Sequence, residues 1–117
     1  MSEWNPVSVE RAIVDVVDEI VDGIRKASDA YSQFLSTNHS YDLAFARSYM
    51  KYDGPAHAKR YAAEIATEQE RTSRDAADVA YRYIERFNKA LEKKLDALRS
   101  IGVSVRQAYA EAGKGEW

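Results

Sequence analysis

The sequence has no cysteine, and its 117 residues include only two prolines, five glycines and two histidines. Without cysteine, neither a disulfide framework nor a cysteine-based metal site can form. Turns depend on glycine and proline, so their scarcity argues against a β-rich fold of this size. Alanine, the best helix former, occurs 18 times. The composition therefore predicts an all-α protein, and the length allows a single domain covering residues 1–117.

Long apolar runs are also missing. Charged residues interrupt every apolar stretch, whereas a membrane-spanning helix needs about 20 mostly apolar residues. The first six residues, Met-Ser-Glu-Trp-Asn-Pro, contain neither the basic nor the apolar region of a signal peptide. We therefore expect a cytoplasmic protein with no membrane partner.

The side chains that usually carry out catalysis or hold cofactors are few. Neither histidine, His39 or His57, lies in a motif that presents a serine nucleophile to a base. Glu64 and Glu68 are not followed three positions later by the histidine that helical di-metal sites use. The segment Asp53-Gly54-Pro55 lacks the Gly-Lys-Ser/Thr ending of a phosphate-binding loop. We expect no catalytic, cofactor-binding or metal site, and a protein that is not an enzyme.

Apolar side chains recur every three or four residues in the first third of the chain, which is typical of an amphipathic helix. They are Val9, Ile13, Val16, Ile20, Ile24, Ala27, Tyr31 and Phe34. This pattern predicts a helix over about 7–36, with Asn5 as its cap and Pro6 as its first residue. Ser36-Thr37-Asn38-His39-Ser40 favours a break, followed by a second helix over about 41–52. The alternative is one helix that continues to Tyr52 with a kink.

Asp53-Gly54-Pro55 predicts a chain reversal, with Gly54 left-handed past the helix end and Pro55 opening the next helix. No proline follows, which predicts one long C-terminal helix over about 55–111. Its apolar stripe includes Ile65, Val79 and Tyr83, and it weakens over residues 66–75. The ends, residues 1–5 and 113–117, are expected to be flexible.

Charge is distributed unevenly along the chain. Residues 1–22 contain six acids and one base, whereas residues 81–107 contain seven bases and three acids. Opposite charges favour packing of the two N-terminal helices against the long helix, as a helical hairpin or coiled coil. A core of one stripe per helix is thin for this chain length, so we expect a homo-oligomer. Extra valines widen the apolar face of the first helix. The predicted oligomer interface is Val14, Val17, Val21, Ile13 and Ile20.

Basic and aromatic residues surround the predicted reversal, an arrangement typical of single-stranded nucleic-acid binding. The candidate contacts are Arg47, Lys51, Lys59, Arg60, Tyr52 and Tyr61. The same tyrosines are also suited to packing the end of the hairpin while the cations remain solvated. The acidic isoelectric point, about 5.7, favours this second interpretation.

Four segments between Tyr41 and Tyr109 carry a resemblance to a known family. They read LAFARSYMKYDGPAHAKRYAAEIA, TEQERTSRDAADVAYRY, KALEKKLDALRS and SVRQAYAEA. Together they resemble a family of small helical proteins of unknown function encoded by bacteriophages, chiefly those of actinobacteria. The resemblance implies no known catalytic residues and places the protein in the cytoplasm of an infected host. Members of the family often lie among replication and recombination genes.

Two functions follow from these observations. The first is a non-enzymatic helical interaction protein that self-associates and binds a host or phage protein. The alternative is a nucleic-acid-associated accessory factor in phage replication or recombination that uses the basic aromatic turn.

Overall fold

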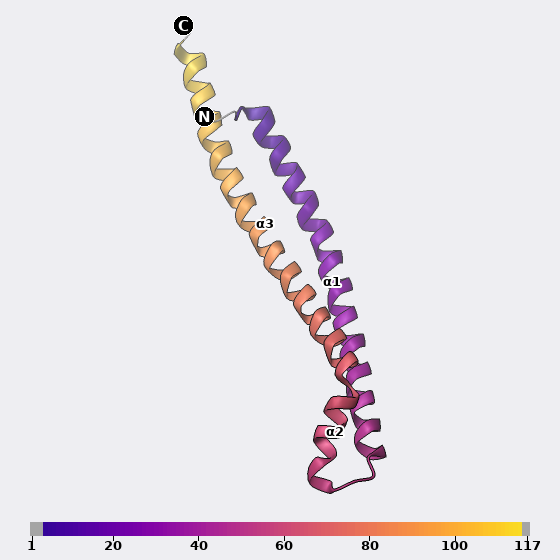
Figure 1. Cartoon of the computed structure of the whole chain (residues 1–117). Helices are drawn as coiled ribbons and strands as arrows, with labels where there is room; N and C mark the ends of the chain where they lie inside the picture. The colour runs from indigo at the N-terminus through magenta and orange to yellow at the C-terminus, as the bar shows by residue number, and fades with distance from the viewer. Residues whose placement is uncertain (1–3, 116–117) are drawn as a thin grey trace. The chain divides into compact units, whose positions relative to one another are not determined.

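The computed structural model describes residues 4–115, with side chains up to Gly113, and this part of the chain contains helices and no strand. Its elements are α1 (Pro6–Lys51), the 3-10 helix η1 (Ala56–Ala58), α2 (Lys59–Ala66) and α3 (Glu68–Gly115) (Figure 1). The predicted all-α hairpin with a long C-terminal helix is confirmed. Of the ends expected to be flexible, residues 1–3 and 116–117 lie outside the described residues. Helix α3 continues beyond the predicted end near residue 111.

Helix α1 begins where the sequence predicts, with Asn5 as its cap and Pro6 as its first residue. The backbone N–H of Ser8 donates to Oδ1 of Asn5 at 2.9 Å. In return, the backbone N–H of Asn5 donates to Oγ of Ser8, also at 2.9 Å. This reciprocal pair satisfies two backbone N–H groups, those of Asn5 and Ser8, that have no carbonyl partner within the helix.

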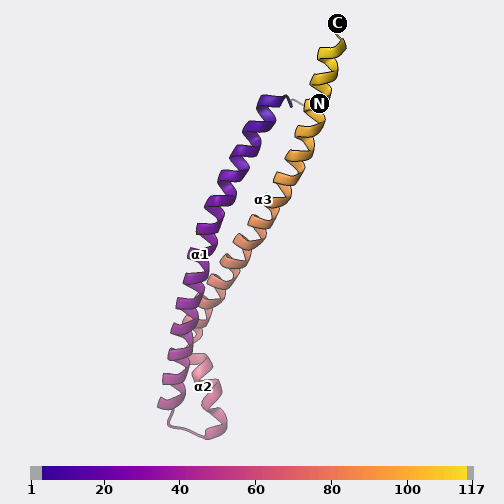
Figure 2. The ribbon, with the colours of Figure 1, turned by 180° about the vertical axis from the view of Figure 1, so that it is seen from behind.

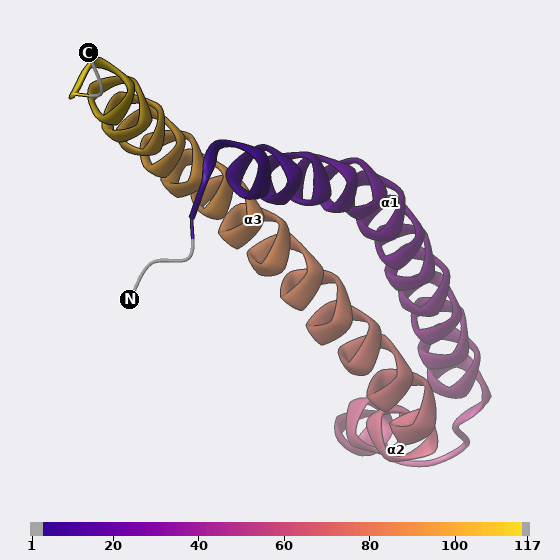
Figure 3. The ribbon, with the colours of Figure 1, turned by 90° about the horizontal axis from the view of Figure 1, so that it is seen from above.

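The predicted break over residues 36–40 is absent, because residues 6–51 form one continuous helix (Figure 3). The alternative of a single continuous helix is therefore the one observed, and it ends at Lys51, one residue before Tyr52. Within this stretch, Oγ1 of Thr37 donates to the carbonyls of Gln33 and Phe34, at 3.0 Å each. The hydroxyl that was expected to compete with the helix is therefore satisfied by carbonyls of the same helix.

The chain reverses between Lys51 and Ala56, as predicted, but without a left-handed glycine. No residue in the described range has a positive φ, so the left-handed conformation expected for Gly54 is wrong. A Cβ at Gly54 would overlap the hydroxyl end of the Tyr52 ring, so that side chain would have to move aside.

The long helix was expected to start at Pro55, but the α-helical chain after the reversal is interrupted at Thr67. This residue has φ −114° and ψ 23°, and it separates α2 from α3 (Figure 2). The hydroxyl of Thr67 donates to the carbonyl of Ala63 at 2.7 Å, and the carbonyl of Thr67 accepts from the backbone N–H of Arg71 at 3.0 Å. The interruption lies at the start of the span, residues 66–75, where the sequence pattern weakens.

The chain forms two compact units, and each contains part of α1 and part of α3. The first unit comprises residues 1–25 and 86–117, and the second comprises residues 26–85. The expectation of a single domain over residues 1–117 stays a prediction, since both long helices contribute to each unit.

Two contacts define the pairing in the first unit. Nδ2 of Asn88 donates to the carbonyl of Gly23 at 2.9 Å. Toward the start of α1, the side chain of Val9 packs on Gly102. Because the earlier residue of α1 meets the later residue of α3, the two segments run antiparallel. This is the predicted pairing of the acidic helix with the basic part of α3.

The least exposed residues of the first unit recur at spacings that alternate between four and three residues on both helices. This spacing is the seven-residue repeat of a coiled coil. On α1 they are Val9, Ile13, Val16, Ile20 and Gly23, and on α3 they are Asn88, Leu91, Leu95, Leu98, Gly102 and Val105. We call these two rows the seam. Apart from Asn88 and the glycines, the seam of this unit is aliphatic.

The seam of the second unit keeps the repeat with smaller and more polar side chains. On α1 it follows Ala27, Ala30, Phe34, Thr37, Tyr41, Ala44 and Ser48, and on α2 and α3 it follows Ala63, Thr67, Glu70, Arg74, Ala77, Tyr81 and Ile84. Aromatic contacts link its two sides. The rings of Tyr31 and Tyr81 are 5.1 Å apart, and the guanidinium of Arg74 lies 4.5 Å from the ring of Tyr41.

A double-mutant cycle tests the Gly23–Asn88 contact. Gly23→Ala alone should change the free energy of unfolding little. The gain in helix propensity, about 1 kcal/mol, is offset by the overlap of the new Cβ with the Asn88 carboxamide and the loss of its hydrogen bond. In an Asn88→Ala background the overlap is gone, so Gly23→Ala should stabilise the protein by about 1 kcal/mol. Urea denaturation measures the four free energies, and additive effects would contradict the contact.

Candidate self-association surface

Four exposed aliphatic side chains form a second stripe on α1, each one residue beyond a seam position. Val14, Val17, Val21 and Ile24 are 57%, 40%, 63% and 67% exposed. We call them the valine stripe. Their spacing repeats the alternation of three and four, so they lie on one face of α1 beside the seam. Soluble monomers seldom expose contiguous apolar rows, and such rows mark interaction surfaces.

The predicted oligomer interface is divided between two faces of α1. Val14, Val17 and Val21 are in the exposed valine stripe. Ile13 and Ile20 are half-buried seam residues, where α1 packs on α3 within the first unit. The structure therefore places three of the five predicted residues where another molecule can reach them.

Ile24 is the member of the valine stripe that the sequence pattern missed. Periodicity assigned Ile24 to the core stripe, because it follows Ile20 at a helical spacing. In the structure the seam position after Ile20 is Gly23, where the side chain of Asn88 approaches the α1 backbone. Glycine has no side chain, so a search for apolar side chains at helical spacing cannot detect it in the seam. The search therefore assigned the next apolar residue, Ile24, to the core.

The outer edge of the valine stripe carries charges of alternating sign. Arg11, Asp18 and Arg25 follow one another at seven-residue intervals, and all three are exposed. Arg25 forms an ion pair with Asp22 across 2.8 Å. Surface pairs of this kind add little to folding stability, but they influence which surface can approach the stripe.

The predicted apolar stripe of the long helix faces outward in the second unit. Ile65 is 77% exposed and Val79 is 67% exposed, whereas the seam contains Thr67 and Arg74. The expectation that Ile65 and Val79 pack in the core is wrong. Ala63 and Ala77 are buried in the seam and set the phase of the seven-residue repeat. The seam positions in this phase lie one or two residues away from the most apolar side chains of the segment.

The basic turn, which comprises the six residues predicted to contact nucleic acid, is partly occupied by contacts within the second unit. Nζ of Lys59 lies 5.2 Å from the ring of Tyr49, and Nε of Arg60 is 3.2 Å from Oε1 of Glu64. The ring of Tyr52 covers Gly54. The other three residues of the basic turn, Arg47, Lys51 and Tyr61, are exposed and form no such cation–π contact or ion pair within the described part of the chain.

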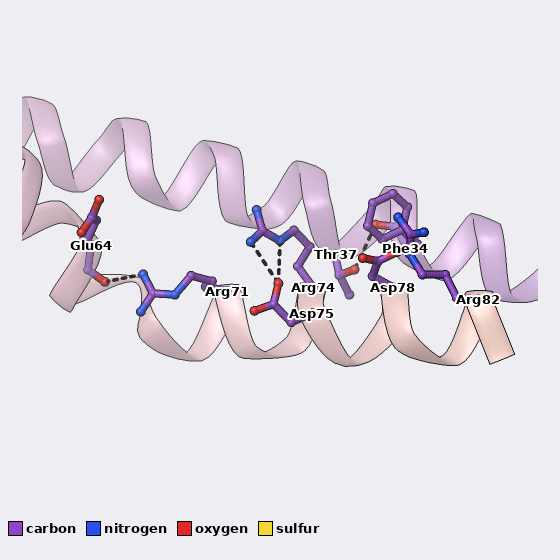
Figure 4. Close-up of polar contacts among 8 residues, drawn as sticks. All are labelled: Phe34, Thr37, Glu64, Arg71, Arg74, Asp75, Asp78 and Arg82. Atoms are coloured by element: carbon purple, nitrogen blue, oxygen red, sulfur yellow. Dashed lines mark hydrogen bonds and ion pairs between the residues drawn. The ribbon is translucent and has the colours of Figure 1, made fainter.

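Polar contacts hold the second unit at the α2–α3 interruption. Nη1 of Arg71 donates to the carbonyl of Glu64 at 3.3 Å, which satisfies an acceptor near the end of α2 (Figure 4). Farther along α3, Arg74 pairs with Asp75, and Arg82 with Asp78 at 2.9 Å.

In the described part of the chain, no cluster of three or more acidic or histidine side chains could hold a metal ion.

Comparisons with known proteins found no counterpart. No family model, curated protein or solved structure matches the chain. The resemblance to actinobacteriophage proteins therefore stays a prediction. Among the described residues, no helix is both long and apolar enough to cross a membrane.

Tyr81, in the seam of the second unit, has a shifted pKa. Its hydroxyl donates to Oε2 of Glu85 at 3.0 Å, and this hydrogen bond, with partial burial and the negative charge of Glu85, raises the pKa of Tyr81 above 10.0. A raised pKa means that the folded state favours the protonated phenol. The stabilising contribution is fully present below pH 10.0 and is lost as the pH rises through the folded-state value.

Glu85→Gln should therefore move the pKa of Tyr81 back toward 10.0, because the amide accepts a weaker hydrogen bond and carries no charge. An NMR titration of the tyrosine ring resonances measures the change, and Tyr81→Phe assigns the signal. Glu92→Gln, which changes charge by the same amount on the same helix, is the control. An unchanged pKa in Glu85→Gln would contradict the assigned cause.

Proposed function

We propose that this chain is a non-enzymatic helical interaction protein that self-associates through the valine stripe and presents the resulting assembly to a protein partner. The observation that carries the proposal is the row Val14, Val17, Val21 and Ile24, exposed beside the seam at coiled-coil spacing. Complete burial of an aliphatic side chain of this size contributes about 1.5–3 kcal/mol. A second helix packed on the stripe would gain, at each position, the share of this contribution that belongs to the 40–67% of the side chain still exposed.

Val14→Gln with Val21→Gln should weaken self-association by on the order of a hundredfold in Kd, since two aliphatic side chains lose their burial. Glutamine keeps a good helix propensity, so circular dichroism should remain that of the wild type. Sedimentation equilibrium over a wide concentration range measures the assembly. Met50→Gln, which replaces an exposed side chain of the second unit, is the control. A wild-type chain that remains monomeric at millimolar concentration would refute the proposal.

A second candidate is a nucleic-acid-associated accessory factor, and one observation favours it. Arg47 and Lys51 lie one turn apart on α1, and neither forms an ion pair within the part of the chain that the structure describes. Tyr61, 64% exposed, belongs to the same unit and offers a stacking surface.

If this second candidate is correct, Arg47→Ala with Lys51→Ala should weaken binding to a single-stranded oligonucleotide. It should also reduce the slope of log K against log salt by about 1.4, because two phosphate contacts are lost. Fluorescence anisotropy at several salt concentrations measures both quantities. Arg60→Ala is the control, since Arg60 pairs with Glu64. Absence of binding by the wild type at low salt would remove this candidate.

A further inference from the structure

The valine stripe shares its side of the first unit with a charged row of α3. In an antiparallel helix pair, the residues that follow the seam on one helix lie on the same side as those that follow it on the other. Each residue of the valine stripe follows a seam position of α1, and we call this side of the unit the valine face. The exposed residues that α3 contributes to it are Lys89, Glu92, Asp96, Arg99, Val103 and Arg106.

The charges of α1 differ between the two sides of the helix. Asp15 and Glu19 each precede a seam position, so they point away from the valine face. The edge of the valine stripe instead carries Arg11 and Asp18, two exposed side chains of opposite sign that lie two helical turns apart. Neither forms an ion pair with another residue in the described part of the chain. A molecule that covers the stripe therefore meets these local charges and not the net charge of the helix.

Two copies of the stripe can satisfy these charges by packing on each other in opposite directions. In an antiparallel pair the charged edges of the two helices lie together. In a parallel pair each charged edge would instead lie beside the seam of the other copy, which α3 covers. If a twofold axis passes between Val14 and Val17, Val14 of each copy meets Val17 of the other. Arg11 of each copy then lies beside Asp18 of the other, and the contact occurs twice.

This register also covers the ends of the stripe. Val7 is 64% exposed and precedes Val14 by seven residues, so it extends the stripe toward the start of α1. Ile24 of each copy packs on Val7 of the other. Between these layers Val21 lies opposite Glu10, a charged residue at a position of the repeat. Glu10 also lies on the valine face, nearly level with the guanidinium-bearing row of α3, so its carboxylate has cations to approach.

The charges of α3 select the same register independently. The seam contacts of the first unit fix the level of each α3 residue along α1, and they place Arg99 beside residue 12 and Glu92 beside residue 19. With the same twofold axis, residue 12 of one copy is level with residue 19 of the other. Arg99 of each copy is therefore level with Glu92 of the other. Asp96 lies near the axis, and Arg99 of its own chain is 3.9 Å from it.

The register that would place the middle of the stripe on the axis is opposed by the same charges. Its axis would pass at the level of residue 19, and each valine-stripe residue would meet another. Arg11 would then lie beside Arg25 of the other copy. Asp18 and Glu92 would each meet their own counterparts. Like charges across an interface oppose association, so the alternation of sign favours the register that brings Arg11 beside Asp18.

We propose that the valine stripe packs antiparallel on the valine stripe of a second copy, with Arg11 of each copy beside Asp18 of the other. This inference rests on the proposed self-association and names the occupant of the stripe, its direction and its register. The twofold axis lies between Val14 and Val17. Because each copy uses the same surface, the contact closes after two copies and the assembly is a dimer. The opposite face of the first unit stays uncovered for a protein partner.

Two charge-reversal variants test the register. Arg11→Glu places an acid beside Asp18 of the other copy, and Asp18→Arg places a base beside Arg11. Each variant alone should raise the dimer Kd by about tenfold or more, because two attractive contacts become two repulsive ones. An equimolar mixture of the two variants should restore a Kd close to that of the wild type, because each acid then faces a base in the mixed dimer.

Lys94→Glu and Asp15→Arg are the matched controls, since they change charge by the same amounts on the opposite face. Each should keep the wild-type Kd. Sedimentation equilibrium measures the dimer, and circular dichroism checks that each variant keeps its helices. Reversal variants that associate like the wild type, or a mixture no tighter than either variant alone, would refute the register while self-association stands. A limiting mass above twice that of the monomer would refute the closed dimer. A wild type that never associates refutes the proposed function itself.

Discussion

The seven-residue repeat shared by the two long helices is the constraint on which the rest of this molecule depends. In the first unit it brings aliphatic side chains of α1 and α3 together over several turns, with Asn88 donating to the backbone of Gly23 at one position. A strict repeat allows each helix only one narrow buried row. Every apolar side chain outside that row must remain in solvent or meet another molecule. The valine stripe is therefore a direct consequence of the way the hairpin packs.

The two units use the same repeat with different chemistry. The aliphatic seam of the first unit excludes water and gains its stability from burial. The second unit relies on aromatic contacts, such as Tyr31 with Tyr81, and on the cation–π contact of Arg74 with Tyr41. Such contacts depend on direction and contribute less per residue than complete burial of a large aliphatic side chain. Most of the energy that holds α1 to α3 is therefore expected in the first unit, the one that carries the valine stripe.

The sequence was most informative where local chemistry decides the structure. The start of α1 depends on Asn5 and Pro6, and the reversal depends on the chemistry near Pro55, so both were predicted. The phase of the seam is set by contacts between distant residues. Gly23 lies in the seam because Asn88 packs there, and no local pattern shows that Ile24 is then turned outward. Three of the five predicted interface residues nevertheless lie in the valine stripe, because extra valines beside a regular stripe already indicated a second face.

If the chain self-associates as proposed, the thin seam would couple assembly to folding. Few of the described side chains are buried within one copy, among them Val9, Val16, Leu91 and Leu98. Removing apolar surface at the valine stripe would add a second row of burial to the same part of α1, so the helix would be packed on two sides instead of one. Any ligand that binds only the folded state shifts the folding equilibrium toward it, and another copy of the chain acts in the same way. Stability should then rise with protein concentration, and the surface that selects the partner would also complete the core.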